Sequence, residues 1–75
     1  MEQLTYGEKS VGLSFNPGNN EKVDHIKRQC ADVIDNLNIL RERTDNQEVK
    51  RMLSIAITEI QTAQMWAVKA VTWQH

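Results

Sequence analysis

The chain has 75 residues, a single cysteine, 40% hydrophobic residues and a formal net charge of −1. So short a chain forms one domain near the lower size limit for a self-sufficient core, and one cysteine excludes an intrachain disulfide. The balanced charge offers no overall electrostatic field that would attract nucleic acid or an anionic membrane. No apolar run approaches the ~20 residues of a membrane span, and no signal-peptide pattern is present. We therefore expect a soluble cytosolic protein.

Residues 1–18 lack helical periodicity and are expected to form an irregular N-terminal loop segment. They contain all three glycines, the only proline and the only tyrosine and phenylalanine. A flexible tail is normally poor in aromatic residues, so this segment is expected to pack on the rest of the chain. Asn16, Asn19 and Asn20 are each suited to cap the helix that follows, and Pro17 suits a turn or a first helical position.

The first helix is predicted over about residues 19–41. Asp24 and Arg28 have the i,i+4 spacing of an ion pair on its outer surface. Cys30 lies on its apolar face, where a buried, inert thiol is the expected role. Apolar residues alternately three and four apart predict its core-facing stripe: Val23, Ile26, Cys30, Val33, Leu37 and Leu40.

The second helix is predicted over about residues 45–73. Thr44 and Gln47 fit a capping box, and Asp45 and Glu48 fit the same pattern one residue later. Apolar residues with the same alternating spacing predict its core-facing stripe: Val49, Leu53, Ala56, Ile60, Ala63, Ala67 and Ala70.

A short connection between two such helices implies an antiparallel hairpin. The predicted fold is therefore all-α: a two-helix hairpin over residues 19–75 that follows the segment 1–18, in a single domain. Each helix would contribute one stripe to the shared core.

A second set of apolar residues on the later helix predicts an interface. Ile55, Trp66 and Trp73, here called the tryptophan stripe, lie roughly 120–140° from the core-facing stripe at about 100° per residue. A partner helix that covers the first stripe leaves this one in water, and exposed tryptophans usually mark an interface. Because no disulfide or metal site is indicated, oligomerisation is the remaining reinforcement. We expect a homo-oligomer with these residues between subunits, where any ligand site would also lie.

Signatures of catalysis and of metal binding are missing from the sequence. No Ser–His–acid or Cys–His arrangement and no glycine-rich phosphate loop after a strand is present. His25 and His75 are far apart, and no ligand spacing joins either of them to Cys30. We therefore expect a binding protein that is not an enzyme and uses neither metal nor cofactor.

Lys27 and Phe15 are the first candidates for a ligand site. Lys27 borders the core-facing stripe near the start of its helix, where free N–H groups and the helix dipole favour an anion. It could extend past an apolar edge, pair with Asp24, or contact phosphate beneath the N-terminal aromatic residues. Phe15 and Tyr6 serve either as loop anchors or as platforms for a nucleotide base.

Lys69 is the second candidate. Its i−3 and i+4 neighbours are Trp66 and Trp73, and no acidic residue lies three or four positions away. Its stem either shields the indoles, or its charge is presented beside two stacking surfaces at the subunit interface.

Three segments carry a resemblance to a known family: Val11–Pro17 with its Phe-Asn-Pro turn, Val23–Lys27 with its Ile-Lys pair, and Ala56–Ala70. Together they resemble the phage anti-CBASS and anti-Thoeris cyclic-nucleotide sponges, over about residues 11–73. The resemblance implies a homohexamer in the host cytoplasm that binds cyclic di- or trinucleotides, or cyclic ADP-ribose isomers. It also implies that the ligand is held without hydrolysis, so that bacterial effectors are not activated.

The same resemblance implies roles for individual residues. Phe15 would stack on a base and Lys27 would contact phosphate, with Asn16 and Pro17 of the turn beside them. Lys69 would serve a separate trinucleotide pocket. Phe15 lacks the hydroxyl of the tyrosine in some relatives, and Lys69 offers a point charge where some relatives carry a bidentate arginine.

Two other functions stay open. An oligomeric helical interaction module would use the tryptophan stripe to bind a host or phage protein. Nucleic-acid binding is opposed by the balanced charge along both helices, although Lys22, Lys27 and Arg28 form a local basic patch.

Overall fold

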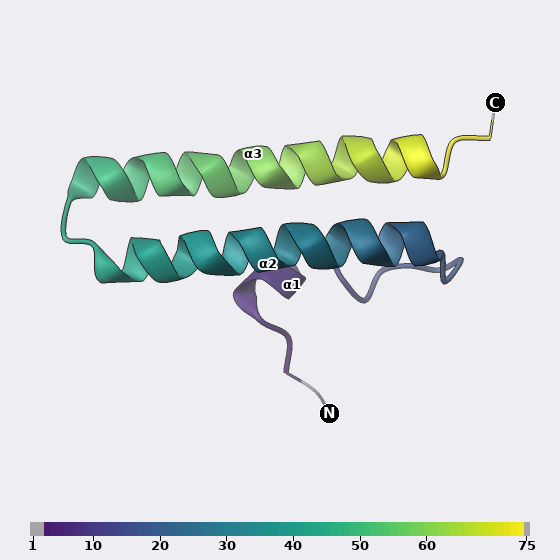
Figure 1. The fold of residues 1–75 in the computed structure, drawn as a ribbon, viewed down its shortest axis with the longest axis horizontal. Coiled ribbons are helices and arrows are strands. Elements are labelled where there is room, and N and C mark those ends of the chain that lie inside the picture. The colour runs from purple at the N-terminus through teal and green to yellow at the C-terminus, as the bar shows by residue number, and fades with distance from the viewer. Residues whose placement is uncertain (1–2, 75) are drawn as a thin grey trace.

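The computed structural model describes residues 3–74, which form three helices: α1 (Tyr6–Ser10), α2 (Glu21–Arg43) and α3 (Gln47–Val71). Helices α2 and α3 run antiparallel, side by side, and α1 lies against α2 (Figure 1). No strand occurs within the described range, so the predicted all-α hairpin is confirmed. None of the described helices combines the length and apolar character needed to cross a membrane.

Both long helices begin two residues later than the sequence predicts, because asparagines cap them. The Asn20 side chain accepts hydrogen bonds from the main-chain N–H groups of Lys22 and Val23, and Asn46 caps α3. The prediction that Thr44 or Asp45 caps the second helix is wrong. The N–H group of Thr44 still bonds to a carbonyl of α2, so Thr44 ends that helix and only Asn46 remains to start the next one.

The N-terminal segment is more regular than predicted, because it contains α1. Thr5 and Glu8 form a capping box in which each side chain accepts a hydrogen bond from the other residue's main chain. This pattern is visible in the sequence and indicates a helix start. The segment packs on the hairpin as predicted: the N–H group of Gly7 donates to Asp35 Oδ1 at 2.6 Å, and Val11 and Leu13 are buried.

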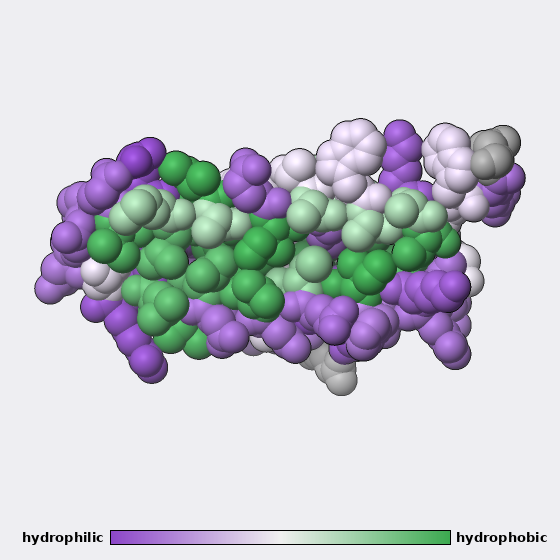
Figure 2. Space-filling model, turned by 45° about the horizontal axis from the view of Figure 1, so that its top comes forward, coloured by the Kyte–Doolittle hydropathy of each residue, from purple (hydrophilic) through white to green (hydrophobic). Residues whose placement is uncertain are grey.

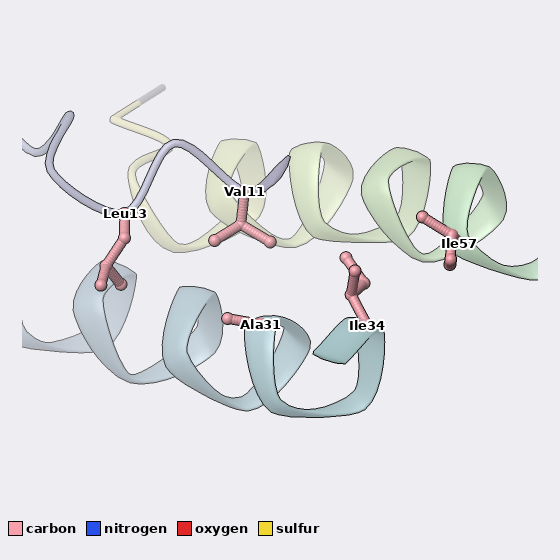
Figure 3. Close-up of a cluster of buried hydrophobic side chains, with 5 residues drawn as sticks. All are labelled: Val11, Leu13, Ala31, Ile34 and Ile57. Atoms are coloured by element: carbon pink, nitrogen blue, oxygen red, sulfur yellow. The ribbon is translucent and has the colours of Figure 1, made fainter. Parts of the chain in front are cut away.

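The core lies between the hairpin and this segment. Ile34 is fully buried at its centre, and Figure 3 shows it with the other members of the cluster: Val11, Leu13, Ala31 and Ile57.

The predicted core-facing stripes coincide with the core only in part: Val23 is buried, and Cys30, Leu37 and Ile60 are partly buried against the core cluster. The residues actually buried in α2 are Val23, Lys27, Ala31 and Ile34, and those in α3 are Ile57 and Gln64. Val33 and Leu40 of the predicted stripe are 46% and 52% exposed. The reason is that α1 and its loop cover one side of the hairpin, so the buried sector of α2 turns toward them and away from the opposite side.

That opposite side is a continuous apolar surface, here called the open apolar face. Figure 2 shows hydrophobic residues along most of the length of the molecule, over both long helices. Its members are half-buried or exposed: Ile26, Cys30, Val33, Leu37 and Leu40 of α2, and Val49, Leu53, Ala56, Ile60, Ala63, Ala67 and Ala70 of α3.

Candidate functional site

A cavity of about 480 Å³ opens at the end of the hairpin opposite the α2–α3 turn, where α2 begins and α3 ends. This volume lies within the range of small-molecule binding sites. Three parts of the chain line it: Phe15, Asn16, Pro17 and Gly18 of the loop; Asn20, Val23 and Lys27 of α2; and Val68, Val71, Thr72, Trp73 and Gln74 from the last turn of α3 onward.

The loop owes its shape to asparagine chemistry. The Asn16 amide donates to the carbonyl of Asn20 at 3.0 Å and accepts from the N–H group of Asn20 at 3.1 Å. Asn19 has a φ of 47°, in the left-handed region that asparagine tolerates better than most residues. Asn16 therefore closes the turn, and Pro17 lies at the edge of the cavity inside that turn.

Lys27 lies under this loop, with only 6% of its surface exposed. Its ammonium group donates to the main-chain carbonyls of Gly12 at 2.9 Å and Phe15 at 2.5 Å. These bonds compensate the burial of a charged group. The sequence alternatives of an extended stem or a pair with Asp24 do not describe this geometry, because Asp24 pairs with Arg28 at 2.8 Å as predicted.

The cavity suits an anion. Among the lining residues that belong to the described range 3–74, only Lys27 carries a charge and none is acidic. An ammonium group has three N–H donors, and two of those of Lys27 are used; the third has no partner within residues 3–74. An anionic oxygen that reached this donor would form a charge-assisted hydrogen bond shielded from water.

Phe15 combines a fixed backbone with an exposed ring. Its N–H group donates to the carbonyl of Gly12 at 2.9 Å, and Gly12 has a φ of 61°, which glycine adopts readily. The Phe15 side chain is 74% exposed, and its ring centre lies 5.6 Å from the Lys27 nitrogen. Tyr6, the other aromatic candidate, lies instead against the Arg41 guanidinium at 5.4 Å and does not line the cavity.

Lys69 belongs to a different surface. Its nitrogen lies 5.1 Å from the ring centre of Trp66 and 5.7 Å from that of Trp73. Lys69 does not line the cavity, so the structure joins Phe15, Asn16, Pro17 and Lys27 but leaves Lys69 outside. Ile55, Trp66 and Trp73 are 46%, 65% and 60% exposed.

The end of α3 also contributes to the cavity, which was not predicted from the sequence. Val68, Val71 and Trp73 line it together with the loop residues. A signal for this was available: two antiparallel helices of similar length place the end of one beside the start of the other.

Metal-ligating side chains do not gather in the described part of the chain. Within residues 3–74, no three His, Cys, Asp or Glu side chains lie close enough to hold a metal ion. His75, which the sequence analysis weighed as a ligand, lies outside the described residues. Cys30 is partly buried on the open apolar face, and burial raises the pKa of its thiol above the ordinary value of 9.0.

A comparison with protein families gives a match over most of the chain. The family model described as Acb2/Tad1, hairpin domain, matches residues 8–72. This range includes the loop, all of α2 and α3, and every cavity residue except Trp73 and Gln74. Searches of curated proteins and of solved structures gave no match.

Proposed function

The chain belongs to the Acb2/Tad1 hairpin-domain family of anti-CBASS and anti-Thoeris sponges, and from this premise we propose that it sequesters a cyclic oligonucleotide immune signal in the cavity beneath Phe15. Members of this family bind cyclic oligonucleotides. The observation that carries the proposal is the cavity itself, which is lined by a buried lysine next to an exposed phenyl ring and by no other charged side chain of the described residues. By blocking the signal in the host cytoplasm, the protein would prevent CBASS- or Thoeris-type defence.

The chemistry of the site fits the two halves of a nucleotide. A phosphodiester oxygen would accept from the remaining N–H donor of Lys27, and a hydrogen bond to a charged group is worth about 1.5–3 kcal/mol. A base would stack on Phe15, where stacking contributes about 1–3 kcal/mol. Sequestration requires no acid, base, metal or cofactor, so the proposed activity is binding without hydrolysis.

Self-association is part of the proposal, with the family resemblance favouring a hexamer. The open apolar face supports it, because a monomer rarely leaves so long an apolar surface in water. Its α2 side carries large residues such as Leu37 and Leu40, whereas its α3 side carries alanines such as Ala63 and Ala67. A two-fold axis through this face would set the large side chains of one copy against the small ones of the other.

The tryptophan stripe supports the second candidate function. Trp66 of α3 and Trp73, which lies beyond the end of α3 at Val71, expose 65% and 60% of their surfaces. If the open apolar face joins the subunits, these indoles stay accessible on the oligomer and could bind a host or phage protein. Under this alternative to nucleotide sequestration, the protein is an oligomeric interaction module. The prediction that Ile55, Trp66 and Trp73 contact neighbouring subunits stays a prediction.

Isothermal titration with cyclic di- and trinucleotides and cyclic ADP-ribose isomers, at a known oligomer mass, tests the proposal. We expect sub-micromolar binding of at least one ligand (Kd below about 1 μM) and recovery of that ligand intact after the protein is denatured. No binding across the panel would favour the interaction module. Recovery of a linear or hydrolysed nucleotide would overturn sequestration without catalysis.

A further inference from the structure

We infer that Trp73 is a ligand-binding residue whose indole stacks on a base of the bound nucleotide, an inference that rests on the function proposed above. Phe15 and Trp73 line the same cavity from different parts of the chain, the loop before α2 and the segment after α3. Both rings are largely exposed, at 74% and 60%. The cavity therefore offers two aromatic surfaces in addition to its buried lysine, and a cyclic dinucleotide has two bases to place on them.

The position of Trp73 is fixed by the way α3 ends. The N–H group of Thr72 donates to the carbonyl of Val68 at 3.1 Å, and the Thr72 hydroxyl donates to the same carbonyl at 2.8 Å. The N–H group of Trp73 then donates to the carbonyl of Ala70 at 3.3 Å. These bonds hold the chain against the last turn of the helix, so Trp73 is attached to a capped end rather than to an unstructured tail.

Lys69 helps to orient the indole. Its nitrogen lies 5.7 Å from the centre of the Trp73 ring, close to the 5.6 Å that separates Lys27 from the Phe15 ring. Each aromatic surface of the cavity thus has a lysine beside it, although only Lys27 lines the cavity. Lys69 acts on the ligand through Trp73 and is a positioning residue.

Trp66 provides the comparison that separates this role from a general interface role. Trp66 and Trp73 are similarly exposed, at 65% and 60%, and both contact Lys69. Only Trp73 lines the cavity, and it lies just beyond the range that the family model matches. The sequence pattern placed both in one stripe, whereas the cavity distinguishes them.

The first experiment measures affinity and mass together. Cyclic di-GMP, cyclic di-AMP and cyclic GMP–AMP are titrated into the wild type, Trp73→Ala, Trp73→Phe and Trp66→Ala, with light scattering on each protein. We expect Trp73→Ala to weaken binding roughly tenfold or more at unchanged oligomer mass, Trp73→Phe to restore most of it, and Trp66→Ala to match the wild type. Wild-type affinity in Trp73→Ala, or a weakening accompanied by a fall in mass, overturns the inference.

The second experiment uses fluorescence, because the chain contains only two tryptophans. Trp66→Phe leaves Trp73 as the only indole, and Trp73→Phe leaves Trp66. A cyclic dinucleotide should quench the emission of the first variant and leave that of the second unchanged; equal responses contradict stacking on Trp73. If the wild type binds no cyclic nucleotide, the proposed function fails and the inference fails with it. If the wild type binds but neither the affinity nor the emission depends on Trp73, only the inference fails.

Discussion

The Lys27 ammonium group donates a 2.5 Å hydrogen bond to the main-chain carbonyl of Phe15 and lies 5.6 Å from the centre of the same residue's ring. The cation and the aromatic surface expected to bind a nucleotide are thus held together by contacts within the chain itself. Pre-organisation of this kind lowers the ordering cost of binding, which favours tight sequestration. It also means that changes to Lys27 act on both the charge and the loop.

Replacement of Lys27 by methionine should weaken cyclic dinucleotide binding by roughly tenfold or more, because the charge is lost while the apolar stem is kept. The matched control is Lys22→Met, which removes an exposed lysine of α2 that does not line the cavity. Titration calorimetry measures both affinities, and circular dichroism checks that both proteins stay helical. Equal affinities for the two variants would show that Lys27 does not contribute to ligand binding.

Replacement of Gly7 by alanine should destabilise the protein by about 1–3 kcal/mol, the usual cost of overpacking. A Cβ at this position would overlap the carbonyl oxygen of Ala31 and crowd Asp35 Oδ1, so α1 would have to move off α2. Urea unfolding followed by circular dichroism measures the change.

Gly18→Ala is the control for that measurement. A Cβ at Gly18 meets nothing within 4 Å, so we expect a change within about 0.5 kcal/mol. If Gly7→Ala were as stable as Gly18→Ala, the close contact between α1 and α2 would not contribute to the fold.

Replacement of Ala63 by glutamate should lower the oligomer mass toward the 8.7 kDa of one chain. Ala63 is exposed in the single chain, so the fold tolerates the change, but a charge on the open apolar face opposes its burial between subunits. Thr58→Glu, at an exposed α3 position outside this face, is the control. Light scattering measures the mass of each; unchanged mass in Ala63→Glu would exclude the face as the subunit contact.

The Cys30 thiol should make stability depend on pH in the alkaline range. Burial raises its pKa in the folded state above the ordinary 9.0, so between these two pKa values the folded chain binds more protons than the unfolded chain. The stabilisation is full below the unfolded pKa and is lost as pH rises toward the folded one. Urea unfolding of the wild type and Cys30→Ala from pH 7 to pH 10 should show a steeper decline in the wild type above about pH 9. Parallel declines would contradict this prediction.

Much of the site was accessible from sequence because its parts are local. Asn16 and Pro17 lie in a turn that their own chemistry forms, and Phe15 precedes that turn directly. Lys27 follows Gly12 by 15 residues and Phe15 by 12, so its two loop contacts join neighbouring parts of the chain. Trp73 could not be placed in the same way, because its position at the cavity depends on how far α3 extends beside α2.

The sequence by itself determined two amphipathic helices, their antiparallel pairing and the turn that begins α2, because periodicity and asparagine caps act over a few residues. Only the tertiary structure decided which apolar residues are buried. The apolar sector of each helix is wider than one partner helix can cover, and the N-terminal segment takes the side nearest Ala31 and Ile34. Leu40 and Ala63 therefore stay exposed, and that choice depends on contacts between segments distant in the chain.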